Sequence, residues 1–432
     1  MTDQTVTFLF LLALALSVPL HLWLGSRQIR HVAHHRKQVP ADFAAVVPLE
    51  AHQKAADYTI ARQKLDLIEL FWGTAVLVGW TLMGGLDVLN GAVRDALLPR
   101  WGAMGYQLGL FVAFSLIGSL LDVPFSLWRV FRLEQRFGFN RMTPGLWLRD
   151  QLMQGLVGLL IGLPLAAMVL WFMASAGPWW WLWAFAAMAL FMVAMMIVYP
   201  TVIAPMFNRF EPLPDGELKS RVEALMSRCG FRAKGFFVMD GSRRSAHANA
   251  YFTGFGSGKR VVFFDTLLKR LDVDEIEAVL AHELGHFHHR HVARRMGLML
   301  GIWLLTLALI GWLMTQPAFY LGLGVRPSLD APNHALALLL VMMVGPVFTF
   351  LASPIGASTS RRHEFQADAF ASQHARADKL RSALLKLYED NASTLAPDPL
   401  YVSFHYSHPP ASARLTALAA LETQAHPGKG VA

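Results

Sequence analysis

The residues most able to do chemistry lie in the run His282-Glu-Leu-Gly-His286. The apolar periodicity around this run predicts a helix that begins after Asp272, where Glu275 completes a capping arrangement. On a helix, two histidines four residues apart lie on one face and can bind one zinc ion. Glu283 lies one position round the helix, where its carboxylate could take a proton from zinc-bound water. The spacing therefore predicts a metal site that activates water.

A catalytic zinc needs a third protein ligand, and the chain offers a candidate further on. No glutamate occurs between Glu283 and Glu364, and Glu364 follows directly after an uncharged run, in a stretch with helical character. Asp368 is four residues further on the same helix face, where it could accept a hydrogen bond from a zinc-bound histidine. We therefore expect His282, His286 and Glu364 to bind one Zn²⁺ per chain, with Glu283 as the general base.

The histidine-rich surroundings leave other readings open. We expect one nearby group to lie at the membrane interface rather than in the site: His288, His289 and His291. A second group with helical spacing is not expected to bind a functional metal: His31, His34 and His35.

The elements that position these residues belong to a membrane protein. Of 432 residues, 54% are hydrophobic and only 16% are charged, whereas soluble proteins carry about 25% charged residues. Disorder is excluded because so much apolar surface can be buried, and the single cysteine, Cys229, excludes a disulfide scaffold. Five runs hold no charged residue: 4–26, 101–121, 151–208, 296–325 and 331–360. Runs this long indicate membrane helices, which need about 20 apolar residues each, rather than buried helices of a large soluble core.

We expect a mainly α, polytopic membrane protein with about seven transmembrane helices and a cytoplasmic zincin-like metallopeptidase domain that contains a small β-hairpin. The predicted spans lie near 6–24, 68–88, 105–128, 152–173, 179–200, 296–316 and 333–355. The first five fall in an N-terminal membrane region, 1–205, and the last two in a metallopeptidase region, 206–432. The hairpin is predicted from Ala250–Phe255 and Arg260–Phe264, which flank a glycine-containing turn.

The distribution of positive charge predicts the orientation. Lys and Arg concentrate in the connections 25–67 and 129–151, and the alternate connections hold few. This pattern places the N-terminus outside and both the zinc helix and the C-terminus in the cytoplasm. The net charge of +8 is then explained by membrane topology. We expect membrane lipid as a partner of the chain. No glycine-rich phosphate loop or RNA-binding signature is present, so we expect no nucleic-acid partner.

Several segments together resemble one known family, the type I CAAX prenyl proteases, which are integral-membrane zinc metallopeptidases of the gluzincin kind. The resemblance spans roughly 5–420 and rests on motifs in the family's order: His282–His286, Glu364-Phe-Gln-Ala-Asp368, Asp122-Val-Pro-Phe-Ser-Leu-Trp, Phe137-Gly-Phe-Asn-Arg-Met-Thr-Pro144 and Tyr199–Leu213. The shorter heat-shock membrane proteases share the zinc motifs but lack this N-terminal half.

The resemblance implies further site residues. The segment Ser245–Gly254 is similar to the family's substrate-binding strand, which implies that His247, Asn249, Ala250 and Tyr251 contact substrate. The run Tyr406–Arg414 is similar to the family's final signature, which implies that His408 and Arg414 line the site and stabilise the oxyanion or bind peptide. An edge strand at Ala250 could pair with an extended peptide.

The resemblance also implies a chamber enclosed by the spans, and peptide or protein substrates with a C-terminal prenylated cysteine. The chain ends without a dilysine tail, so we expect a bacterial inner membrane, or the endoplasmic reticulum membrane for a eukaryotic chain. In a bacterium, a general role in clearing membrane-associated peptides fits equally well.

Two other protein classes compete with this interpretation. An intramembrane site-2-type protease also uses His-Glu-x-x-His, but the helix around His282 carries too many charged residues for the middle of a bilayer. A non-catalytic channel or scaffold with structural zinc would need four protein ligands and no base, and Glu283 argues against it.

Overall fold

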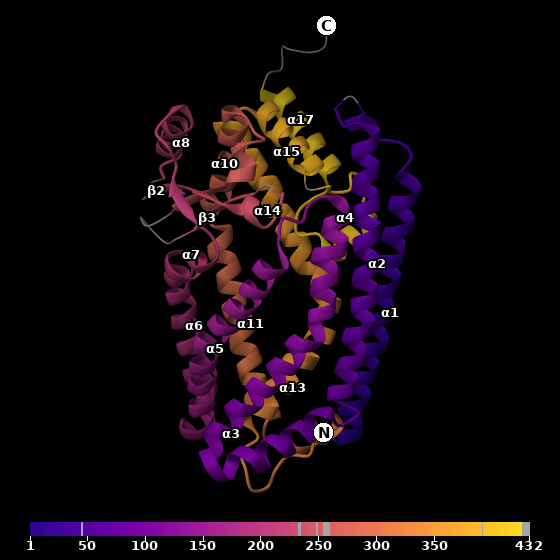
Figure 1. Cartoon of the computed structure of the whole chain (residues 1–432), viewed down its shortest axis with the longest axis vertical. Helices are drawn as coiled ribbons and strands as arrows, with labels where there is room; N and C mark the ends of the chain where they lie inside the picture. Colours follow the sequence, from indigo (N-terminus) through magenta and orange to yellow (C-terminus); the bar gives the residue numbers. More distant parts are fainter. Residues whose placement is uncertain (45, 232–234, 248, 254–259, 391, 426–432) are drawn as a thin grey trace.

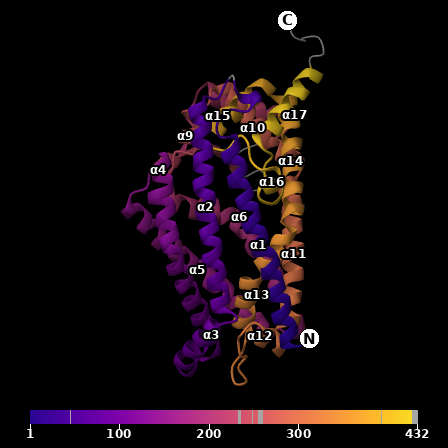
Figure 2. The ribbon, with the colours of Figure 1, turned by 90° about the vertical axis from the view of Figure 1, so that its right-hand side faces the viewer.

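The structure is a computed structural model in which long helices run along one axis and a globular part caps one end of them (Figure 1). It describes residues 1–432 except 45, 232–234, 248, 254–259, 391 and 426–432. The N-terminus lies at the end of the molecule opposite the C-terminal helices in both views (Figures 1 and 2).

The axial helices build the membrane region. They are α1 (Asp3–His35), α2 (Leu49–Trp80), α3 (Gly85–Trp128), α5 (Pro144–Ser175), α6 (Trp180–Val198), α11 (His291–Leu313), α13 (His334–Thr349) and α14 (Ser353–His374). Short helical segments extend some of them: η2 (Arg129–Glu134), α4 (Gln135–Phe137), η4 (Tyr199–Ile203), α7 (Ala204–Phe207) and η7 (Phe350–Ala352). Six helices of the described residues are long and apolar enough to cross a membrane: Asp3–His35, Gly85–Phe137, Pro144–Ser175, Gly177–Phe207, His291–Leu313 and His334–His374.

The surface of this bundle is apolar. Large side chains such as Leu160, Trp183 and Leu305 are exposed on α5, α6 and α11, as expected where lipid replaces water. An open hollow of about 420 Å³ lies between α1, α2, α3 and α13. The mainly α, polytopic membrane fold predicted from the sequence is confirmed.

The range 68–88, which we predicted as one span, is divided in the structure. Helix α2 ends at Trp80, a turn follows, and α3 begins at Gly85. Gly84 adopts φ +77°, a left-handed conformation that suits glycine. The break is hidden in the sequence because the turn residues between the two helices are themselves largely apolar. Helix α2 packs along α1, but its first half is polar, and it is not among the six helices above.

The globular part combines a small sheet with helices. Its strands are β1 (Phe210–Pro212), β2 (Gly235–Met239), β3 (Ala250–Thr253) and β4 (Arg260–Phe264), in the order β1-β2-β4-β3. Its helices are α8 (Glu217–Arg228), α9 (Asp265–Leu268), α10 (Val273–His288), α15 (Ala377–Asp390), α16 (Pro399–His405) and α17 (Ala411–Ala425), and the short α12 (Pro317–Gly322) lies between α11 and α13. The predicted hairpin corresponds to β3 and β4, which pair antiparallel, and β4 pairs parallel with β2. The strands β1 and β2 were not predicted from the sequence. Strand β3 lies at a sheet edge, as expected.

The membrane region and the globular part are joined by direct contacts. Residues 139–141 pair with 244–246: the Ala246 amide donates to the Phe139 carbonyl at 3.2 Å, and the Arg141 amide donates to the Arg244 carbonyl at 3.2 Å. The Arg244 guanidinium binds both carboxylate oxygens of Asp150, at 2.8 and 3.0 Å. These contacts fix the segment that leads into β3.

Candidate metal centre

Helix α10 carries the first two predicted ligands and begins where the sequence indicates. The Asp272 side chain accepts from the Glu275 amide at 2.8 Å, and the Glu275 carboxylate accepts from the Asp272 amide at 2.8 Å. This is the predicted capping box. Glu275 is buried and also binds Ser382 and Lys386 of α15. The start of the ligand helix is therefore fixed both to its own backbone and to a neighbouring helix.

Helix α14 lies very close to α10 because both helices carry small residues where they meet. A Cβ added at Gly285 would lie 2.8 Å from the Cα of Ala367, and Ala367 is fully buried. Gly285 precedes His286 in α10, and Ala367 lies between Glu364 and Asp368 in α14. This close approach brings the carboxylates of one helix against the imidazoles of the other. Neither small residue carries a mark in the sequence that predicts this contact.

The three predicted ligands converge. The Nε2 atoms of His282 and His286 are 3.3 Å apart. They lie 3.5 and 3.4 Å from the two carboxylate oxygens of Glu364. Among the described residues, these three are the group whose ligand atoms all lie within 4.8 Å of one another.

This arrangement fits a zinc ion. Atoms held about 2.1 Å from zinc in tetrahedral geometry are about 3.4 Å apart, close to the spacing of these three residues. Glu364 Oε2 is buried and has no hydrogen-bond partner within the described part of the chain. Arg414 Nη1 lies 3.7 Å from this oxygen, too far for a hydrogen bond, so the oxygen can still bind a metal ion. The donor set of two imidazoles and one carboxylate is one that zinc accepts in catalytic sites.

Asp368 and Arg414 lie behind His282. His282 Nδ1 is 2.8 Å from Asp368 Oδ1, and Arg414 donates to both oxygens of Asp368, at 2.9 and 2.6 Å. Burial and Arg414 lower the pKa of His282, but the neighbouring carboxylates of Asp368 and Glu364 outweigh them and raise the pKa to about 9. Burial lowers the pKa of Arg414, but Asp368 raises it above its ordinary value. Asp368 therefore lies against His282, and Arg414 is buried behind both residues.

A different partner lies behind His286. His286 Nδ1 is 3.0 Å from Nδ1 of His291, and His291 Nε2 is 2.8 Å from Oε1 of Gln366. We expected His291 at the membrane interface, but the structure buries it against the site. Periodicity could not find it, because the turn between α10 and α11 brings it back toward His286.

The two residues predicted to be catalytic, His408 and Glu283, lie on the open side of the site. His408 Nε2 is 3.4 Å from Glu364 Oε1, and the His408 side chain is 64% exposed. Ser407 Oγ lies 3.0 Å from His408 Nδ1. Glu283 is half-buried, beside His282 on α10, and makes no hydrogen bond or ion pair with the residues that the structure describes.

The predicted substrate residues divide into two sets. Ala250 and Tyr251 are on edge strand β3, and Asn249 is exposed just before it, with its side-chain oxygen accepting from the Ala250 amide at 2.8 Å. His247 instead stacks on Phe139 at 4.6 Å and lies 3.6 Å from Glu134 of the membrane region. The position of His247 therefore favours a role in joining the two parts of the chain.

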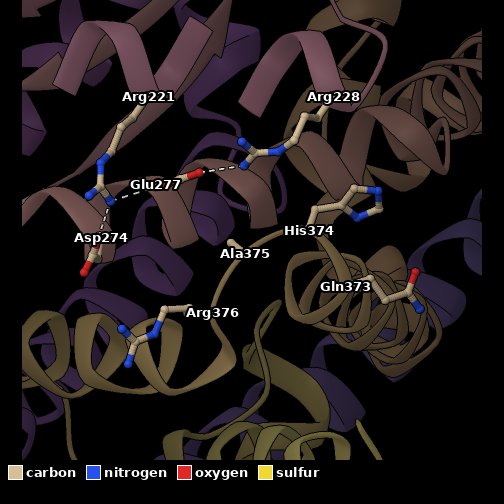
Figure 3. A pocket seen from close by; sticks show the side chains of 8 residues that line it. All are labelled: Arg221, Arg228, Asp274, Glu277, Gln373, His374, Ala375 and Arg376. Carbon is tan, nitrogen blue, oxygen red and sulfur yellow. Dashed lines mark hydrogen bonds and ion pairs between the residues drawn. The ribbon is translucent and has the colours of Figure 1, made fainter. Parts of the chain in front are cut away.

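A separate surface hollow of about 380 Å³ lies between α8, α10 and the connection from α14 to α15 (Figure 3). Its arginines are engaged with carboxylates: Arg221 binds Asp274, Arg228 binds Glu277 at 2.7 Å, and Arg376 binds Asp378 at 2.5 Å. The first two ion pairs tie α8 to α10, whereas the third is local to the start of α15. The hollow is lined by none of the three predicted metal ligands.

Comparison with known proteins gives the family. Residues 28–209 match a family described as CAAX prenyl protease N-terminal, five membrane helices, and residues 212–422 match Peptidase family M48. The chain is 34% identical over 391 residues to a CAAX prenyl protease 1 homolog of Arabidopsis thaliana, covering 88% of this chain and 90% of the relative. It is also 34% identical over 390 residues to CAAX prenyl protease 1 of Saccharomyces cerevisiae, covering 85% and 86%.

A solved structure, the crystal structure of S. mikatae Ste24p, superposes with a TM-score of 0.88 at 30% identity and covers 97% of this chain and 99% of the other. Because the resemblance covers nearly the full length of both chains, it excludes the two other interpretations, a non-catalytic scaffold and a site-2-type protease. The chain belongs to the CAAX prenyl protease 1 family of M48 peptidases and is an integral-membrane zinc metalloendopeptidase.

Proposed function

We propose that His282, His286 and Glu364 bind one Zn²⁺ per chain and that this centre hydrolyses a peptide bond next to a prenylated cysteine near the C-terminus of a substrate. The observation that carries the proposal is the convergence of these three residues, whose ligand atoms all lie within 4.8 Å of one another. Zinc held there would polarise the scissile carbonyl and lower the pKa of a water molecule.

The residues around the centre have distinct tasks in this proposal. The Glu283 carboxylate accepts the proton of the attacking water and delivers it to the nitrogen of the leaving amine. Ser407 Oγ lies 3.0 Å from His408 Nδ1; with the hydroxyl donating there, His408 Nε2 would carry the ring proton and could donate to the carbonyl oxygen as negative charge develops. Asp368, held by Arg414, keeps His282 Nδ1 protonated and turns its Nε2 toward the metal.

The substrate would bind along β3. An edge strand has unpaired backbone groups, so an extended peptide can add to it as a further strand. Asn249, Ala250 and Tyr251 are placed to contact such a peptide.

For the surroundings we propose the orientation that the charge distribution favours. The globular part and C-terminus lie in the cytoplasm of a bacterial inner membrane, the N-terminus lies outside, and the membrane and peptidase regions divide near 205–206. A reporter active only in the cytoplasm, fused after Ala432, should be active, and an inactive fusion would overturn this topology.

Digestion of matched prenylated and non-prenylated peptides, with cleavage positions read by mass spectrometry, tests the function. We expect cleavage after the prenylated cysteine. Glu283→Ala should keep about one zinc per chain and lose cleavage, whereas cleavage at the wild-type rate would refute the proposed base. Equal cleavage of both peptides would favour general clearance of membrane-associated peptides instead.

A further inference from the structure

The two metal-binding histidines differ in what lies behind them. His282 Nδ1 faces the carboxylate of Asp368, an anion held by a buried arginine. His286 Nδ1 faces the imidazole of His291 at 3.0 Å. A hydrogen bond between two ring nitrogens requires one of them to carry a proton and the other to keep its lone pair.

Gln366 decides which nitrogen carries the proton. His291 Nε2 lies 2.8 Å from Gln366 Oε1, which is an amide oxygen and can only accept. His291 Nε2 must then carry the proton, so in the neutral ring Nδ1 keeps its lone pair. That lone pair accepts from Nδ1–H of His286, which leaves His286 Nε2 free to bind the metal. Reversing the chain of hydrogen bonds would put the proton on His286 Nε2 and block metal binding.

The backbone explains how His291 reaches this position. Helix α10 ends at His288, and Arg290 adopts φ +56°, a left-handed conformation that is uncommon for a residue with a Cβ. The chain reverses there, and His291 begins α11 buried at 4% exposure. Its ring stacks on that of His363 of α14, with centroids 3.9 Å apart and planes 10° apart. Stacking fixes the plane of the ring, and the two hydrogen bonds fix its rotation.

We propose that His291 and Gln366 are positioning residues that set the tautomer and orientation of His286 for metal binding. The inference rests on the proposed zinc site of His282, His286 and Glu364. Neither residue touches the metal or the substrate in this proposal, and both act only through the Nδ1–H of His286. Outer partners of this kind typically contribute about 10- to 100-fold to metal affinity.

Zinc affinity of the purified full-length protein in detergent, measured by competition with a chelator, tests the proposal. Gln366 is exposed, so its variants should fold. Gln366→Leu removes the acceptor and should weaken zinc binding about 10- to 100-fold. Gln366→Glu keeps an acceptor oxygen and should bind within about threefold of wild type, a rescue that a purely structural role would not produce. His291→Ala should resemble Gln366→Leu, and His288→Ala, an exposed histidine of the same turn, should have no effect.

Wild-type affinity in both His291→Ala and Gln366→Leu would overturn the inference. So would equal loss in Gln366→Leu and Gln366→Glu. Failure of the proposed zinc site would appear differently, as His286→Ala that binds zinc like wild type. Circular dichroism of each variant shows whether a lost affinity reflects unfolding.

Discussion

Gly285→Ala should destroy the metal centre although it adds a single methyl group outside the ligand set. The new Cβ would lie 2.8 Å from the Cα of Ala367, 3.1 Å from its carbonyl oxygen and 3.1 Å from the Cβ of Phe370. Two of these three atoms are backbone, so no side-chain rotation relieves the contact. Carbon atoms prefer separations of about 3.5–4.0 Å, so α10 and α14 must move apart by about 0.7–1.2 Å.

That displacement is large compared with what zinc tolerates. Zinc–oxygen and zinc–nitrogen distances vary by only about 0.2 Å between sites. Glu364 is on α14 and both histidines are on α10, so the whole movement falls on the bond between Glu364 and the metal. We expect zinc affinity to fall by about 100-fold or more, at the upper end of effects seen for residues that only support a ligand.

The effect on stability should be much smaller. Overpacking costs about 1–3 kcal/mol, while replacing a helical glycine by alanine returns up to about 1 kcal/mol. The free energy of unfolding should therefore fall by about 0–2 kcal/mol, and the protein should remain folded.

The assay pairs chelator competition for zinc with thermal unfolding followed by circular dichroism. Gly297→Ala on α11 is the matched control, because a Cβ there meets nothing within 4 Å. It should keep both affinity and activity. If Gly285→Ala binds zinc as tightly as wild type and still cleaves peptide, the spacing of the two helices does not set the site and the reasoning fails.

Three further predictions follow from the same geometry. Asp368→Ala leaves the Arg414 guanidinium buried without its main partner. The free energy of unfolding should therefore fall by about 3–5 kcal/mol, and zinc should bind more weakly. Unchanged thermal stability would contradict this prediction. Asp150→Asn weakens the contact with Arg244 that fixes the segment before β3. It should lower kcat/KM about 10- to 100-fold because the substrate is misplaced, while the zinc content stays unchanged. Loss of zinc would point to another cause. Chelation of the metal should abolish cleavage while the helical circular dichroism signal stays, and a large loss of helix would mean that the metal also holds the fold.

The candidate ligand set, whose members the structure brings together, could be proposed from the sequence because each member leaves a local or compositional mark. His282 and His286 share one face of a helix, and the capping residue Asp272 marks where that helix begins. Glu364 stood out because it is the first glutamate after Glu283. Such signals survive in a single sequence, since they need no knowledge of how distant segments pack.

The features that the sequence did not predict depend on tertiary contacts or on single backbone angles. His291 reaches the site only because Arg290 is left-handed, and no helical periodicity encodes that reversal. Gly285 and Ala367 look like ordinary small residues until the two helices are seen in contact. The break within 68–88 depends on one glycine angle inside an apolar stretch.

The placement of the proposed ligands links the candidate metal centre to the membrane helices. Helix α10 runs through a two-residue turn into membrane helix α11, and α14 continues membrane helix α13 through η7. Glu364 lies eleven residues into α14, about 16 Å from its start at 1.5 Å per residue. Both halves of the centre are thus fixed to helices that the bilayer orients. A substrate whose lipid lies in the same bilayer would therefore meet the centre at a defined depth, and the spacing between α10 and α14 would depend on how α11 and α13 pack in the membrane.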